Sequence, residues 1–186
     1  TLVSTPLNSL VVLADGPIKS IADLKGKKVG FSVGGFEDAL LSAMLGRVGL
    51  TLKDVTLINV NFSLSPALIS GQVDAVIGAF RNFELNQMDI VNHPGRAFYV
   101  EEEGVPAYDE LIVVANAKKL DDDRLPRFVT ALENAAQFLI NHPKEGWAMF
   151  IKGRENLNDE LNKRAFRDTL PRFALRPAAL DHGRYR

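Results

Sequence analysis

The stretch DAVIGAFRNFE, residues 74–84, joins an apolar run to a cluster of polar and aromatic residues. Its run AVIGA is short and apolar and is bounded by polar residues, which favours a buried strand. The chain then presents an arginine, an amide, a carboxylate and two aromatic rings where a helix, residues 81–91, is expected to begin. A strand that runs into a helix through such a turn is typical of an α/β sheet, which binds ligands at its carboxyl edge.

Strands and helices alternate on both sides of this stretch. Apolar runs predict strands at residues 9–15, 27–32, 54–61 and 96–102. Apolar spacing of three and four predicts a helix over residues 36–48, and a shorter helix begins at Ser63 or Ser65. The alternation between about residues 15 and 107 indicates an α/β lobe with a largely parallel sheet. Right-handed crossovers would place its strand-to-helix turns along one edge.

The chain after residue 107 has a different pattern. Residues 108–120 include a further apolar run, which predicts another long buried strand. Three helical patterns follow, and the first has a wide apolar stripe after Asp123. The sequence therefore predicts a second part that is mainly helical.

Composition excludes several classes of chemistry. The 186 residues contain no cysteine, which rules out disulfides, thiol nucleophiles and zinc-thiolate sites. The formal net charge of −1 does not favour binding to nucleic acid. The three histidines lack metal-ligand spacing, and there is no P-loop, dinucleotide fingerprint or nucleophile elbow. We expect the acidic run EEEG, residues 101–104, to be solvated.

Two turns of the predicted sheet carry candidate binding residues. In SVGGFED, residues 32–38, Gly34, Gly35 and Phe36 precede a helix, so their backbone amides can approach an anion or a polar acceptor. A plain tight turn is the alternative for the glycine pair. Asn61 and Phe62 end the next strand, and the serines that follow them are better explained as helix caps.

The third turn is the one in which the opening stretch ends. Phe80 can stack on a planar ring, and Glu84 can accept hydrogen bonds from ring amino groups. Arg81 and Asn82 can donate hydrogen bonds or brace the carboxylate. Each charged residue alone also fits a solvated helix start, but together at a sheet edge they favour a binding site.

Three longer stretches carry a family resemblance: SIADLKGKKVGFSVGG, SPALISGQVDAVIGAFRNFE and EEEGVPAYDELIVVANAKKL. The chain resembles the substrate-binding proteins of ABC importers, in the group that also holds the fungal thiamine-pyrimidine synthases. The resemblance implies a type II periplasmic-binding-protein-like α/β fold with two lobes. Residues 15–107 would be a complete second lobe. Residues 1–14 and 108–186 would be parts of a first lobe truncated at its N-terminus, with crossover strands near residues 9–15 and 109–116.

The resemblance also implies a function. The chain is similar to the branch of the family that binds thiamine pyrimidine precursors of the formylaminopyrimidine or hydroxymethylpyrimidine type. That branch stacks the ring on aromatics, here Phe80 or Phe62, and pairs its amino group with a carboxylate, here Glu84. Tyr108 would contribute from the hinge. The expected protein has no cofactor or catalytic residue, is a periplasmic or extracytoplasmic monomer when full length, and delivers its ligand to a membrane permease.

Three alternatives remain open from the sequence. A binder of another solute, such as an alkylsulfonate or taurine, would need donors and positive charge, which Glu84 opposes and Arg81 offsets. A pyrimidine synthase of the same family is disfavoured because those enzymes use an iron site and a cysteine-rich motif. The effector half of a transcription regulator would need a DNA-binding segment, and none is visible.

Overall fold

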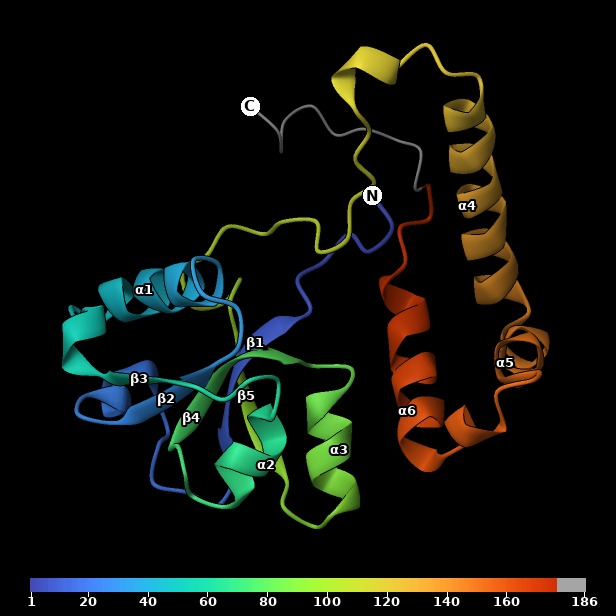
Figure 1. Ribbon diagram of the computed structural model, residues 1–186. Coiled ribbons are helices and arrows are strands. Elements are labelled where there is room, and N and C mark those ends of the chain that lie inside the picture. The colour runs from blue at the N-terminus through green and yellow to red at the C-terminus, as the bar shows by residue number, and fades with distance from the viewer. Residues whose placement is uncertain (177–186) are drawn as a thin grey trace. The chain divides into compact units, whose positions relative to one another are not determined.

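The computed structural model describes residues 1–176, which form two compact units (Figure 1). Leu7–Pro106 make up the α/β unit, and Thr1–Pro6 with the described residues from Ala107 onward make up the helical unit. The division of the chain into a complete second lobe and parts of a first lobe stays a prediction. None of the helices within residues 1–176 is both long and apolar enough to cross a membrane.

The α/β unit contains a five-stranded sheet. Its strands are β1 (Asn8–Leu13), β2 (Lys28–Phe31), β3 (Thr56–Asn59), β4 (Ala75–Phe80) and β5 (Gly95–Tyr99), in the order β3-β2-β4-β1-β5. β2 pairs in parallel with β3 and β4, whereas β1 is antiparallel to both β4 and β5. The sheet is thus mixed. The parallel pairing predicted from the sequence holds for β2, β3 and β4, which end at one edge.

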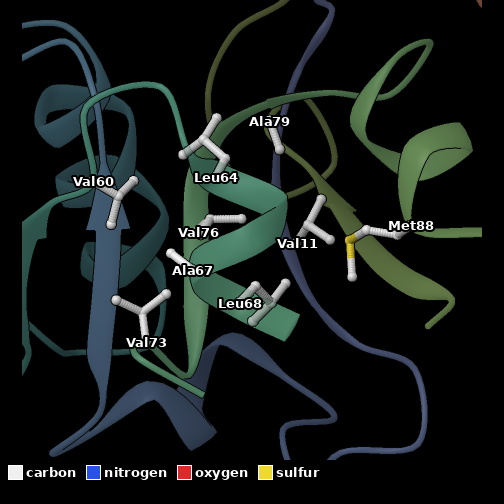
Figure 2. Packing of buried hydrophobic residues seen from close by; sticks show 9 residues of the cluster. All are labelled: Val11, Val60, Leu64, Ala67, Leu68, Val73, Val76, Ala79 and Met88. Carbon is white, nitrogen blue, oxygen red and sulfur yellow. The ribbon is translucent and has the colours of Figure 1, made fainter. Parts of the chain in front are cut away.

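Helices α1 (Glu37–Arg47), α2 (Leu64–Ile69) and α3 (Glu84–Ile90) follow β2, β3 and β4. Figure 2 shows α2 placing Leu64, Ala67 and Leu68 against the valines of the sheet. This apolar cluster also takes in Met88 of α3, so two connecting helices share one core with β4. Two 3-10 helices, Ile21–Leu24 and Leu52–Asp54, each begin with a capping box.

The helix after β4 begins later than the sequence predicts. It was expected from about Arg81, but α3 begins at Glu84. Residues Phe80–Phe83 form a turn in which the Phe83 N–H donates to the Phe80 carbonyl. The turn holds the polar residues of the opening stretch at the strand end instead of in a helix.

Strand β4 contains an irregularity at its centre. Ser9 pairs with Ala79 but the next residue, Leu10, pairs with Ile77, so Gly78 is left without a cross-strand partner. Gly78 has a φ of 93°, which favours glycine. This β-bulge changes the direction of the backbone two residues before Phe80, the last residue of β4.

The helical unit contains α4 (Arg124–Asn141), α5 (Pro143–Ile151) and α6 (Glu160–Thr169), with short 3-10 helices at Ala117–Lys119, Glu155–Leu157 and Leu170–Arg172. Trp147 of α5 packs edge-on against Phe166 of α6, with ring centroids 5.4 Å apart. The three predicted helices are therefore present, and aromatic packing joins the last two.

The long buried strand predicted within residues 108–120 is wrong. The structure has one isolated bridge there, between Val3 and Leu111, and residues 111–120 are exposed. A strand needs a ladder of backbone partners, and Val3 alone supplies a bridge to this segment among the described residues. The apolar run therefore indicates that this segment favours pairing as a strand, but the described residues do not supply the partner strand.

Candidate functional site

The turn between β4 and α3 holds a carboxylate against the end of the strand. The Phe80 N–H donates to Glu84 Oε2 at a distance of 2.6 Å. Burial of the Glu84 side chain raises its pKa above the usual glutamate value, while the hydrogen bond from Phe80 opposes that shift. Glu84 is thus a partly desolvated acceptor, which suits recognition of a ligand donor.

The turn between β2 and α1 contains a second carboxylate, that of Glu37. Glu37 is only 5% exposed, and its Oε2 accepts a hydrogen bond from the Ser32 N–H at 2.7 Å. Burial raises the pKa of Glu37, and the backbone N–H groups of Ser32 and Val33 oppose the shift. The Glu37 side chain therefore folds back on the turn whose backbone amides are predicted from the sequence to bind a ligand.

The Glu37 carboxylate affects the Glu84 carboxylate. The charge of Glu37 contributes to the raised pKa of Glu84. Like charges act in this way when they lie near one another in a poorly solvated region. The β2–α1 and β4–α3 turns are therefore neighbours at the carboxyl edge of the sheet, as their strand pairing requires.

The turn after β3 presents an aromatic side chain to solvent. Phe62 is 75% exposed, and both Asn61 and Phe62 have positive φ values, 47° and 64°. Such a conformation is unusual for a bulky aromatic residue and costs on the order of 1–3 kcal/mol. The Phe62 N–H donates to Ser32 Oγ at 3.0 Å, which ties this turn to the β2–α1 turn.

Arg81 makes its contacts within the fold. Its guanidinium donates two hydrogen bonds of 2.8 Å to the Glu101 carboxylate and lies 3.9 Å from the centroid of the Tyr99 ring. A weaker bond of 3.4 Å reaches the Asn8 carbonyl. Glu101 of the acidic run is partly exposed and paired with Arg81, because β5 ends near the β4–α3 turn and brings the two charges together.

The structure gathers most of the predicted residues at one edge of the α/β unit. They are Gly34, Gly35, Phe36, Asn61, Phe62, Phe80, Arg81, Asn82 and Glu84. Gly34, Gly35 and Phe36 are exposed, whereas Asn82 is buried. Tyr108 belongs to the helical unit, so its part in a shared site stays a prediction.

Sequence reasoning missed Glu37. Its position in the first turn of a helix explains an acidic residue without any binding role, because the helix dipole favours negative charge there. The available signal was a glycine in the middle of the predicted strand AVIGA, which indicates a bulge or a close approach of another group. That group is the carboxylate of Glu37.

The site can accept hydrogen bonds and stack a flat ring. Its two carboxylates accept from donors, and Phe36 and Phe62 expose aromatic surface in turns at the same edge of the sheet. Within residues 1–176, no group of three or more histidine, cysteine, aspartate or glutamate side chains could hold a metal ion.

Comparisons with known proteins identify relatives. A family model described as NMT1/THI5 like matches residues 1–146. A Haemophilus influenzae protein named for thiamine biosynthesis is 57% identical over 186 residues, which is all of this chain and 59% of that protein. The formylaminopyrimidine-binding protein of Halalkalibacterium halodurans is 28% identical over 160 residues, covering 85% of this chain and 48% of that protein. The chain therefore spans about half to three fifths of these relatives.

Enzymes and solved structures also match. The 4-amino-5-hydroxymethyl-2-methylpyrimidine phosphate synthase of Uromyces fabae is 28% identical over 178 residues, covering 89% of this chain and 52% of that enzyme. The periplasmic aliphatic sulphonate binding protein of Escherichia coli is similar in structure, with a TM-score of 0.68 at 17% identity, over 93% of this chain and 60% of that one. This similarity confirms the periplasmic-binding-protein-like fold predicted from the sequence.

Proposed function

Because the chain belongs to the NMT1/THI5-like family, we propose that it captures a thiamine pyrimidine precursor as the solute-binding protein of an ABC importer. The ligand would be of the formylaminopyrimidine or hydroxymethylpyrimidine type. The relative named as a formylaminopyrimidine-binding protein supports this class of ligand. The observation that carries the proposal is the partly buried Glu84 carboxylate at the sheet edge where the turn after β3 also exposes the Phe62 ring.

Glu84 would pair with the amino group of the pyrimidine. An aminopyrimidine presents an N–H donor beside a ring nitrogen that accepts a proton, so a carboxyl group can bind both atoms at once. The Glu84 carboxylate would accept from the amino group, and because burial raises the pKa of Glu84, its carboxyl group takes up a proton for the ring nitrogen more readily than an exposed glutamate would. A pair of hydrogen bonds of this kind would orient the ring in the site.

Phe62 would stack on the pyrimidine ring. It is the most exposed of the aromatic side chains at this edge, and its backbone conformation is unfavourable without a compensating role. Phe80 is partly buried and contributes its backbone N–H to Glu84, so we assign it to support of the carboxylate. Phe36 would contact the rim of the ring.

The remaining predicted residues would have smaller roles. Gly34 and Gly35 would offer backbone amides to polar groups on the ligand, and Asn61 would line the site beside Phe62. Arg81 and Asn82 would hold the end of β4, because the guanidinium of Arg81 is already engaged by Glu101 and Tyr99. Tyr108 would reach the ligand from the hinge once a second lobe closes on it.

The alternatives fit the site less well. A sulfonate such as taurine would meet two carboxylates, at Glu37 and Glu84, which disfavour an anion. A pyrimidine synthase is the function of the Uromyces fabae relative, but the chain lacks the cysteines expected of the family's synthases. We therefore propose a non-enzymatic, extracytoplasmic binder that acts as a monomer with a membrane permease as its partner.

Calorimetric titration of the full-length protein with formylaminopyrimidine, thiamine and taurine tests the proposal. We expect the pyrimidine to bind and taurine to give no heat. Glu84→Gln should weaken binding by about tenfold to 150-fold, the effect of losing a charge-assisted hydrogen bond worth about 1.5–3 kcal/mol. Glu102→Gln, at an exposed glutamate, is the matched control and should bind as the wild type does. Unchanged affinity of Glu84→Gln would contradict the role of Glu84.

Substitution of Phe62 tests the stacking contact. Phe62→Ala should weaken pyrimidine binding by about tenfold, because ring stacking on an aromatic is worth about 1–3 kcal/mol. Phe62→Tyr keeps the ring and should preserve affinity. Equal affinity of the wild type and Phe62→Ala would exclude Phe62 as the stacking residue.

A further inference from the structure

Glu37 is a buried carboxylate that the proposed recognition of a pyrimidine does not use. It is the first residue of α1. Although its side chain is titratable, the residue is only 5% exposed. Buried carboxylates need compensating donors, because transfer of a charge from water is unfavourable. The groups that donate hydrogen bonds to the Glu37 carboxylate therefore indicate the role of this side chain in the turn.

The backbone of the β2–α1 turn supplies those donors. The Ser32 N–H donates to Glu37 Oε2 at 2.7 Å, and the backbone N–H of Val33 also stabilises the ionised carboxylate. A turn from a strand into a helix is where α/β proteins often bind a phosphate, sulfonate or carboxylate from a ligand, through backbone N–H groups. Here the N–H groups of Ser32 and Val33 already serve a carboxylate from the chain itself.

Gly78 makes room for this carboxylate on strand β4. A Cβ atom at position 78 would lie 2.3 Å from Glu37 Oε1 and 2.7 Å from Oε2, which no real contact permits. The bulge in β4 falls at this residue, and its positive φ also requires glycine. Two elements far apart in sequence are thus shaped around one negative group.

We propose that Glu37 is a specificity-determining residue whose carboxylate occupies the anion position of the β2–α1 turn and so excludes anionic ligand groups. Sulfonates, phosphates and carboxylates would find the donors taken and a like charge in place. A neutral, amino-bearing ligand would meet no such repulsion and would remain free to pair with Glu84. The inference deepens the proposed function and rests on it for the identity of the favoured ligand.

Removal of the side chain tests whether the turn is an anion site in itself. In Glu37→Ala the Ser32 and Val33 donors lose their partner and a cavity opens beside Gly78. We expect acetate and methanesulfonate, each at millimolar concentration, to raise the melting temperature of this variant and to leave the wild type unchanged. Asp38→Ala is the matched control, because the Asp38 carboxylate accepts from the Ala39 N–H and not from the turn. Sodium chloride at equal ionic strength controls for salt.

If Glu37→Ala does not fold in plain buffer, recovery of its folded signal in acetate is the same test. No gain from acetate or methanesulfonate in either measurement would overturn the proposal. An equal gain in Asp38→Ala would also overturn it, since the effect would then be general to removal of acid near α1.

A second variant, Glu37→Gln, separates charge from shape. We expect it to bind unphosphorylated hydroxymethylpyrimidine as the wild type does, and to bind the phosphorylated compound about tenfold more tightly than the wild type, a difference of about 1.4 kcal/mol. A purely structural role would change both affinities equally, and that result would contradict the proposal. If neither pyrimidine binds to any variant while acetate still stabilises Glu37→Ala, the proposed function fails and the role of Glu37 stands.

Discussion

Gly78 of β4 lies directly beneath the carboxylate of Glu37 at the start of α1, so closely that a Cβ atom on residue 78 would be 2.3 Å from Glu37 Oε1. Glu37 and Gly78 are some forty residues apart in the sequence, and β3 and α2 lie between α1 and β4 in sequence order. This one contact joins the bulge in the sheet to the turn that precedes α1. It also brings a buried negative charge close to Glu84.

Gly78→Ala should destabilise the protein. The new methyl group would collide with the buried carboxylate, and the positive φ of 93° is unfavourable for alanine, so we expect a loss of at least about 2 kcal/mol in the free energy of unfolding. Chemical denaturation measures it. Gly46→Ala is the control, because Gly46 lies in α1 with no atom within 4 Å of a new Cβ, and it should stabilise by about 0.5–1 kcal/mol.

The collision can be separated from the backbone strain. Glu37→Ala combined with Gly78→Ala should recover part of the lost stability, because the carboxylate that meets the methyl group is gone. Strictly additive losses in the double variant would show that the φ angle alone accounts for the cost.

Neutralising the buried glutamates should stabilise the protein at neutral pH. The pKa values of Glu37 and Glu84 are raised in the folded state, mainly by burial, above the value of about 4.3 expected when unfolded. Stability is then full below the unfolded pKa and falls as pH rises through the folded pKa. Glu37→Gln and Glu84→Gln should each raise the melting temperature at pH 7, and the gain should vanish below about pH 4.

Asp54, a partly exposed aspartate, should make stability depend on pH in the opposite direction. The pKa of Asp54 is lowered by hydrogen bonds from the Thr51 backbone and hydroxyl groups, so its contribution to stability is present above the unfolded pKa of about 3.9 and is lost as pH falls through the folded pKa. Asp54→Asn should therefore lower the melting temperature at pH 7. A gain for Asp54→Asn, or a loss for the two glutamine variants, would contradict these assignments.

The ion pair between Arg81 and Glu101 should stabilise the fold. The guanidinium is largely buried and pairs with both carboxylate oxygens of Glu101, so Arg81→Ala leaves a partly desolvated negative charge without its partner. We expect a loss of about 2–4 kcal/mol in the free energy of unfolding. Glu101→Gln in the same chain should recover part of the loss, and a double-mutant cycle by urea denaturation measures the coupling. Zero coupling would show that the pair contributes nothing.

The helical unit should expose apolar surface when residues 1–186 are expressed alone. Leu111, Ile112, Val113, Phe128 and Met149 are all exposed among its described residues. Large exposed apolar patches favour association. We expect this chain to aggregate or to bind a dye that reports apolar surface, with the fluorescence of the dye and light scattering as the measurements. A monodisperse monomer that melts cooperatively would contradict the prediction.

Local patterns predicted the α/β unit well because its strands and helices each have a strong hydrophobic signature. The run AVIGA became β4, and the apolar spacing of residues 36–48 became α1, closed at Gly49 with a positive φ. The same reasoning failed for residues 108–120. An apolar run shows that a segment favours pairing, but whether a partner strand is present depends on the rest of the chain.

The pattern of apolar runs is enough to predict the succession of strands and helices, and with it the sheet edge that carries Phe62, Phe80 and Glu84, because right-handed crossovers leave few alternative topologies. The burial of Glu37 against Gly78 and the pairing of Arg81 with Glu101 follow from no local pattern and are seen only in the folded chain. The physical reason is that periodicity reports which face of an element is apolar. Desolvation and charge pairing depend on groups that folding brings together from distant parts of the chain.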